Sequence, residues 1–205
     1  MDELKNERQR IKIGVSGAAE TGHCGPDAYD KALELGREVA RQGAVLLTGA
    51  TTGFPMWSAM GAIDAGGISV GLSPANTPKE HIETYNLPTE YMDLILYTGF
   101  GYPGRDIIFT HSTDAMLFGC GRIGTIHEFT VAFEDGKPIG VLQGGWETDE
   151  VIKDILDSGH RPNDMIVFDT DPKTLVEKVL ALVKTQKAAQ LAALRGTTVP
   201  ARAVA

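Results

Sequence analysis

The sequence has few cysteines, no long apolar run and no secretory signal. Its only two cysteines, Cys24 and Cys120, lie far apart among 205 residues, which favours neither a disulfide framework nor a zinc site. No run of eighteen apolar residues occurs, so no membrane-spanning helix is expected. The first ten residues are charged and lack the apolar stretch of a secretory signal. We therefore expect a cytoplasmic protein without a metal site.

An excess of positive charge is also missing. The formal net charge is −8, whereas binding to a nucleic-acid backbone or to an anionic membrane requires a basic surface. We therefore expect neither partner. A small anion can still bind where a few local groups favour it, so a small phosphorylated ligand stays compatible with this composition.

Two common nucleotide-binding motifs are present only in part. The pattern G-x-G-x-x-G occurs at residues 99–104 and 119–124, but a dinucleotide site also needs an acidic residue about 20 positions later. Those positions read Phe-Gly-Cys at 118–120 and Leu-Gln-Gly at 142–144. The first match continues with Arg105 and Asp106 instead of the Lys-Ser or Lys-Thr of a P-loop. NAD binding and P-loop ATP hydrolysis are therefore disfavoured, and no resident cofactor is expected.

Short apolar segments alternate with helical patterns along the chain. This order predicts a single α/β domain: a doubly wound, Rossmann-like, mostly parallel sheet with helices on both faces. We assign residues 1–10 to a charged arm, 11–195 to the domain and 196–205 to a flexible tail. The last helix carries a broad apolar stripe that packs on the domain or on a partner subunit. Strands are expected at 11–16, 44–48, 67–72, 93–97, 115–118, 139–142 and 165–168; helices at 27–42, 53–65, around 105, at 125–134, 149–157 and 171–194; and a loop at 73–88.

A phosphate site is predicted where a strand, a glycine turn and a helix follow one another at residues 115–134. Free N–H groups and the positive end of the helix dipole favour an anion there, and glycines let it approach the main chain. Ligands of doubly wound sheets bind at the carboxyl ends of the strands, where the other glycine loops also lie. The candidate phosphate- or nucleotide-binding residues are Gly17, Ala18, Gly49, Gly53, Gly119, Gly121, Arg122, Ile123, Gly124 and Thr125.

Charged side chains in this region allow functional and structural interpretations. Arg105 lies near a predicted helix start, where a cation gains nothing from the dipole, so it indicates an anionic ligand. Glu128 is expected in the first turn or so of its helix, where a carboxylate is favourable with or without a catalytic role. Arg122 can bind a phosphate or be a solvated loop arginine, and Thr125 can bind a ligand or cap its helix.

Four further residues are interpreted as structural. Cys120 can be reactive if the helix terminus lowers its pKa, but a small buried filler is the preferred interpretation. His23, His111 and His127 show neither metal-ligand spacing nor an obvious carboxylate partner in the sequence. We therefore expect them on the surface or in packing.

The motifs together resemble one known family, the LOG (Lonely Guy) phosphoribohydrolases with their wider nucleotide-binding superfamily. The resemblance covers roughly residues 11–183, including the opening V-S-G-A-A at 15–19, the loop at 49–53 and the S-D-A-like T-D-A at 113–115. The family's P-G-G-x-G-T-x-x-E loop is matched at Gly121, Gly124, Thr125 and Glu128, and Arg105 falls at the spacing of the family's arginine.

Three departures from the family pattern concern the substrate and catalysis. Cys120 replaces the proline, Arg122 replaces the second glycine, and Asp106 replaces the lysine of the family's R-K pair. The same superfamily includes molybdenum-cofactor carrier proteins, to which this variant loop is at least as similar. No S-x-H-K stretch for pyridoxal phosphate is present, so the lysine decarboxylase label given to some members does not apply.

The resemblance implies an N-glycosyl hydrolase that splits a nucleoside 5′-monophosphate into free base and ribose 5-phosphate. Arg105 and Glu128 are then the catalytic candidates: Glu128 stabilises the oxocarbenium-like state or activates water, and Arg105 orients it. The alternative is a non-catalytic nucleotide or pterin carrier, which Arg122 favours because an added cation strengthens ground-state binding. The resemblance also implies a homodimer.

Overall fold

The computed structural model describes residues 9–161 and 164–196, the last three of them by their backbone alone. The predicted arm and tail lie almost wholly outside these ranges. The strands are β1 Lys12–Ser16, β2 Val45–Thr48, β3 Ile68–Ser73, β4 Leu94–Tyr97, β5 Ala115–Phe118, β6 Ile139–Leu142 and β7 Ile166–Asp169. The helices are α1 Ala28–Arg41, α2 Phe54–Asp64, α3 Pro78–Glu83, α4 Gly101–His111, α5 Ile123–Glu134, α6 Thr148–Gly159 and α7 Pro172–Gly196.

All seven strands lie in one parallel sheet, in the order β4-β3-β2-β1-β5-β6-β7. The central strand β1 pairs with β2 on one side and with β5 on the other, so that Val15 lies between Thr48 and Leu117. The chain therefore leaves β1 and β5 in diverging directions. This is the switch point at which doubly wound sheets bind ligands, and the predicted fold class is confirmed.

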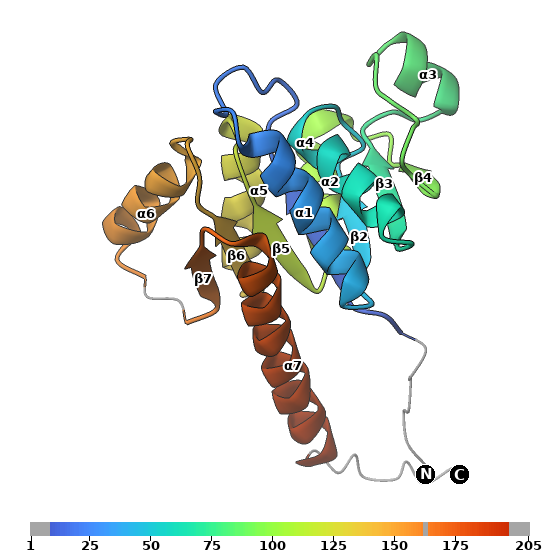
Figure 1. Ribbon diagram of the computed structural model, residues 1–205. Helices are drawn as coiled ribbons and strands as arrows, with labels where there is room; N and C mark the ends of the chain where they lie inside the picture. Colours follow the sequence, from blue (N-terminus) through green and yellow to red (C-terminus); the bar gives the residue numbers. More distant parts are fainter. Residues whose placement is uncertain (1–8, 162–163, 197–205) are drawn as a thin grey trace, which may run out of the picture.

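Two hydrophobic clusters fill the two faces of the sheet. The first joins Val15 and Leu117 to α1, α2 and α7, and the second joins Met116 and Phe118 to α4, α5 and α6. Figure 1 shows α1 and α7 in front of the sheet with α4 and α5 behind it. Strand β5 is buried at every position, because adjacent residues of a strand face opposite layers and both layers are apolar.

Two elements differ from expectation. Residues 73–88 contain a short helix, α3, capped by the Thr77 hydroxyl, which accepts a hydrogen bond from the N–H of Glu80. A six-residue helix has too few apolar positions to show a period in the sequence, although Thr77-Pro78 is a typical start signal. Helix α5 begins at Ile123, two residues earlier than predicted.

The last helix packs on the domain along its first part. Leu175, Val176 and Val179 are buried in the cluster shared with α1 and α2. The apolar stripe seen in the sequence is therefore covered within the chain, and it supplies no argument of its own for a partner subunit. Within the described residues, no helix combines the length and apolar character needed to cross a membrane.

Candidate functional site

A cavity of about 460 Å³ opens at the carboxyl ends of β1, β2 and β5, where the switch point lies. We call it the Arg105 cavity. Most of the predicted site residues meet here, which the glycine loops of three separate segments make possible. The lining includes the predicted residues Gly17, Ala18, Gly49, Arg105, Arg122, Ile123, Gly124, Thr125 and Glu128, and residues that were not predicted, among them Ser16, Thr51, Tyr102 and Asp106.

A buried contact between Arg105 and Glu128 lies in the wall of the cavity. Arg105 on α4 donates from Nη1 to Oε1 of Glu128 on α5 at 3.0 Å, and both side chains are buried. The hydroxyl of Ser16, the last residue of β1, donates to Oε2 of Glu128. Both carboxylate oxygens of Glu128 are thus bound by the protein. The two candidates that lie 23 residues apart in sequence are in direct contact, as the catalytic hypothesis requires.

Arg105 retains an unused donor. Its Nε is buried and has no hydrogen-bond partner among the described residues. A buried N–H without a partner costs free energy unless a ligand or water meets it. The ring of Tyr102, one helical turn earlier, lies 5.9 Å from the guanidinium carbon and provides a cation–π contact.

Asp106 connects this pair to a histidine. Its Oδ1 lies 3.5 Å from Arg105 Nη2, and its Oδ2 lies 2.9 Å from Nδ1 of His127. His127 thus has a carboxylate partner that the sequence did not indicate, and so has His111, whose Nε2 lies 3.2 Å from Asp135; both side chains reach the surface, as expected. Both partners are supplied by other segments of the chain, so spacing around the histidines gave no signal.

Burial controls the protonation of Glu128. Loss of water raises its pKa from an ordinary 4.5 to about 8, and the nearby charge of Asp106 acts in the same direction, while the Arg105 guanidinium opposes both. Glu128 is the sixth residue of α5. It therefore lies in the second turn rather than at the helix start, and the dipole does not account for its position.

The start of α5 has the predicted phosphate-binding features with one exception. Arg122 occupies the N-cap position without capping the helix through its side chain, so the first N–H groups of α5 have no intrahelical partner. The guanidinium of Arg122 pairs with Glu20 on the neighbouring loop, and both side chains are exposed. The N–H of Gly121 is not available, because it donates to the Thr148 hydroxyl at 2.7 Å. Thr125, expected as a possible cap, lies inside the helix.

The predicted glycines serve packing more than direct ligand contact. A Cβ at Gly49 would lie 1.9 Å from Nη1 of Arg105, so only glycine leaves room for the guanidinium. A Cβ at Gly17 or at Gly119 would instead meet the ring of Phe54. Gly53 precedes α2 with a φ of 69° and does not line the cavity. Gly53, Gly119 and Gly121 therefore support the loops around the cavity without forming its wall.

The two cysteines differ most from expectation. Cys24, in the loop between β1 and α1, and Cys120, directly after β5, form a disulfide. Their separation of 96 residues gave no signal in the sequence, whereas the parallel pairing of β1 with β5 brings their following loops together. Cys120 is buried as predicted, but it is not a simple filler. His23 lies beside both sulfurs.

Ser16, Tyr102 and Asp106 were missed as site residues. Ser16 and Asp106 had a usable signal, because Ser16 ends a strand that points at the switch point and Asp106 follows Arg105 in the position that departs from the family pattern. Tyr102 had none. Its contact with Arg105 follows from the helix that starts at Gly101, whose extent the pattern of apolar residues did not define.

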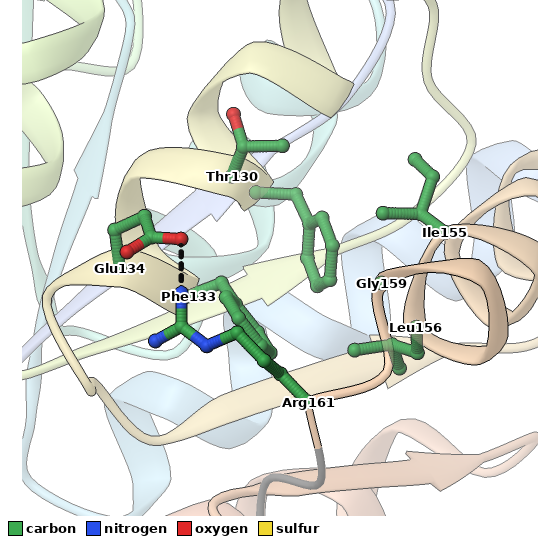
Figure 2. Close-up of a pocket in the computed structure, with 8 residues that line it drawn as sticks. Thr130, Phe133, Glu134, Ile155, Leu156, Gly159 and Arg161 are labelled. Atoms are coloured by element: carbon green, nitrogen blue, oxygen red, sulfur yellow. Dashed lines mark hydrogen bonds and ion pairs between the residues drawn. The ribbon is translucent and has the colours of Figure 1, made fainter.

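The structure has two further cavities, of which one adjoins the Arg105 cavity. One of about 650 Å³, which we call the Trp146 cavity, shares Arg122 and Ile123 with the Arg105 cavity and is also lined by His23, Trp146 and Glu150. Another, of about 220 Å³, lies between α5 and α6. Figure 2 shows apolar side chains around it and the Arg161–Glu134 ion pair at its side. None of the predicted site residues lines this smaller cavity.

Comparison with known proteins identifies the family of this chain and other proteins with its fold. The family model of the SLOG cluster4 family matches residues 10–176. An uncharacterized protein of Archaeoglobus fulgidus is 32% identical over 133 residues, 65% of this chain and 80% of the archaeal one.

Two solved structures share the fold at similar levels of identity. The molybdenum cofactor binding protein of Rippkaea orientalis is 25% identical with a TM-score of 0.67, over 87% of this chain and 98% of that one. The molybdenum cofactor carrier protein of Chlamydomonas reinhardtii is 27% identical with a TM-score of 0.67, over 86% and 99%. The resemblance to the LOG superfamily with its carrier-like members is thereby confirmed. Because the family model covers most of the residues that build the sheet and the cavity, this chain belongs to the SLOG cluster4 family.

Proposed function

We propose that the protein binds a phosphorylated, nucleotide-like ligand of the pterin class in the Arg105 cavity and holds it without turnover. The observation that carries this proposal is the unpartnered, buried Nε of Arg105 beside the uncapped start of α5. A guanidinium donor and free helix N–H groups both favour phosphate oxygens. The two solved structures that are 25% and 27% identical bind or carry the molybdenum cofactor, which supports a ligand of that kind.

Charge in the cavity favours an anion at neutral pH. Arg105 and Arg122 both line it, and the raised pKa of Glu128, about 8, keeps that carboxyl largely protonated near pH 7. The side chain of Asp106 contacts Arg105 and His127. A dianionic phosphate therefore meets two guanidinium groups and a helix N-terminus with little opposing charge from Glu128.

The state of Glu128 also argues for holding over hydrolysis. Arg105 and Ser16 each donate to one oxygen of this group. Donors at both oxygens lower the basicity of the carboxylate, which disfavours activation of water at an anomeric carbon. Catalytic hydrogen bonds often form only in the complex, and this keeps the second candidate in consideration.

The second candidate is the phosphoribohydrolase. It is favoured by the direct Arg105–Glu128 contact next to the start of α5, since this places a carboxyl group near the sugar of any nucleotide whose phosphate lies there. In this function Glu128 assists cleavage of the N-glycosidic bond, and Arg105 positions it.

One experiment separates the two candidates. The purified protein is incubated with AMP, GMP, CMP and UMP while free base is followed by chromatography, and binding of AMP and of a phosphorylated pterin is measured by calorimetry. We expect binding, with no base release. The matched variants are Glu128→Gln, which keeps the shape of the buried group, and Glu134→Gln, an exposed change on the same helix.

The outcomes differ for each function. For a carrier, Glu128→Gln retains most of its affinity, because the group it replaces is already largely neutral at pH 7. Base release by the wild type and by Glu134→Gln that is lost in Glu128→Gln would establish the hydrolase instead. Absence of binding by every phosphorylated probe, inorganic phosphate included, would contradict both candidates.

A further inference from the structure

Three metal-ligating side chains converge outside the Arg105 cavity. His23 and Cys24 lie in the loop between β1 and α1, and Cys120 lies directly after β5. Their possible ligand atoms, one ring nitrogen and two sulfurs, all lie within 4.8 Å of one another. Within the described residues this is the one group of three or more histidine, cysteine or acidic side chains that meets such a criterion.

The positions of these side chains are set by backbone contacts. The N–H of Ala18 donates to the carbonyl of Cys120 at 2.7 Å, which ties the loop after β1 to the loop after β5. The N–H of Cys24 donates to the carbonyl of Thr21 at 2.9 Å and closes a turn around His23. These two hydrogen bonds position the backbone of Cys24 and Cys120. The first of them also positions the start of the loop at residues 119–124, which we call the phosphate loop.

The histidine faces both sulfurs. Its Nε2 lies 3.5 Å from Sγ of Cys120 and 3.9 Å from Sγ of Cys24, and it also lies 3.3 Å from the carbonyl oxygen of Gly121. Both cysteines are fully buried, whereas His23 is exposed and lines the Trp146 cavity. A disulfide needs no imidazole beside it, so the disulfide does not explain the position of His23.

We propose that, in the reduced protein, Cys24, Cys120 and His23 bind one thiophilic divalent cation such as Zn²⁺, and that the disulfide is the metal-free, oxidised form of the same site. Two thiolates and one imidazole match the donors that Zn²⁺ prefers, with bonds of about 2.3 Å to sulfur and about 2.0 Å to nitrogen. The two thiolate charges balance the charge of the cation. Three protein ligands leave a fourth position for water or for a ligand group.

The conversion is balanced in electrons and protons. A dithiol reductant supplies two electrons and two protons, so the S–S bond breaks, two thiols form and the reductant becomes a disulfide. With a phosphine, water supplies the two protons and the oxygen of the phosphine oxide. The cation then binds as both thiols release their protons to solvent and His23 supplies its neutral ring. Oxidation by a small-molecule disulfide, which accepts two electrons and two protons and becomes two thiols, re-forms the S–S bond, removes both anionic ligands and releases the cation. Metal and disulfide therefore exclude each other.

The proposed metal site lies next to the ligand cavities, but the proposal does not depend on the proposed function. Cys120 immediately precedes Gly121, which donates to Thr148, and His23 lines the cavity that also contains Arg122. A cation here lies beside the phosphate loop but uses none of the residues assigned to the Arg105–Glu128 pair. The metal site can therefore be tested with no nucleotide or pterin present.

The test uses the full chain, reduced with a phosphine and freed of metal, and titrated with Zn²⁺ against a chromophoric chelator. A parallel titration with Co²⁺ reports thiolate-to-metal charge-transfer absorption in the near ultraviolet. We expect one equivalent per chain in the reduced protein and none in the oxidised protein. Cys24→Ser and Cys120→Ser are expected to abolish the absorption, and His23→Asn to weaken binding at least about tenfold.

His111→Gln is the matched control, since it removes an exposed imidazole that pairs with Asp135 away from the sulfurs. It is expected to bind as the wild type does. Absence of binding by the reduced wild type, or unchanged Co²⁺ absorption in both serine variants, would overturn the proposal and leave a structural disulfide only. If a serine variant does not fold, the comparison of reduced with oxidised wild type still decides.

Discussion

At the scale of single residues, the site is a short chain of contacts around one buried carboxyl group. Ser16 and Arg105 hold the two oxygens of Glu128, and Asp106 connects Arg105 to His127. The two contacts of Glu128 and the Asp106–His127 contact each join residues from different strands or helices, whereas Arg105 and Asp106 are neighbours on α4. The chemistry of Glu128 is therefore decided by burial and by charges that are remote in sequence, more than by its place in α5.

The raised pKa of Glu128 predicts a specific pH dependence of stability. Its folded pKa of about 8 exceeds its ordinary value of 4.5, so its contribution is fully present below pH 4.5 and is lost as pH rises through 8. The free energy of unfolding should fall between these limits by up to about 1.4 kcal/mol per pH unit. Chemical denaturation at pH 5, 6.5 and 8 measures it.

Glu128→Gln isolates the contribution of Glu128 ionisation to the free energy of unfolding, because the amide cannot ionise and the other titrating groups are retained. We expect the variant to lose less stability than the wild type between pH 5 and 8. Parallel pH profiles for the two proteins would mean that Glu128 does not titrate in this range and that its burial is better compensated by Arg105 than the geometry indicates.

At the scale of elements, the start of α5 is where we propose that an anion binds. The helix has no side-chain cap, and Arg122 stands at its N-cap position with an exposed side chain. In this proposal the free N–H groups of the first turn donate to the anion along the helix axis, and the guanidinium of Arg122 adds positive charge. The glycines of the loop mainly let other elements approach, as Gly119 does for the Phe54 ring.

Arg122→Gln should weaken binding of a phosphorylated ligand by roughly threefold to tenfold, less than a fully buried charge-assisted hydrogen bond provides, because the side chain is exposed. It should also reduce the dependence of affinity on salt concentration. Calorimetric titration of AMP or of a phosphorylated pterin at two salt concentrations measures both effects. Arg161→Gln, which removes another exposed Arg–Glu pair, is the control and should change neither.

At the scale of the whole molecule, one edge of the sheet stands out. Strand β4 is at the end of the sheet order, and its Leu94 and Leu96 are 53% and 47% exposed. Phe100 and Ile107 of the adjoining segment are exposed as well. Exposed apolar side chains on an edge strand favour contact with another chain, so the predicted homodimer would use this edge instead of α7.

Replacing Leu94 and Leu96 with lysine should therefore give a monomer of 22.0 kDa by light scattering, because charge on an edge strand opposes pairing. The control is Leu191→Lys on α7, a position that is also exposed and should leave the dimer intact. A wild-type protein that is already a monomer would contradict the dimer prediction, and a monomer only in Leu191→Lys would place the interface on α7.

The sequence by itself determined the order of most strands and helices and the parallel doubly wound sheet, and it made Arg105 and Glu128 the leading candidates for the site. Apolar strands such as β5 and the glycine turns after strands are local patterns, and local patterns fix the type of an element and the edge of the sheet at which its loop lies. The short helix α3 was missed because its six residues are too few to show a helical period of apolar positions.

Only the tertiary structure decided which side chains touch. The Ser16–Glu128 contact, the Asp106–His127 pair and the convergence of His23, Cys24 and Cys120 each join segments that are far apart in the chain or come from different elements. Sequence spacing does not encode these contacts, because they depend on strand order in the sheet and on the direction in which each loop leaves it. The pairing of β1 with β5 is the physical reason that the loop at residues 119–124, the buried carboxyl of Glu128 and the sulfurs of Cys24 and Cys120 lie close together.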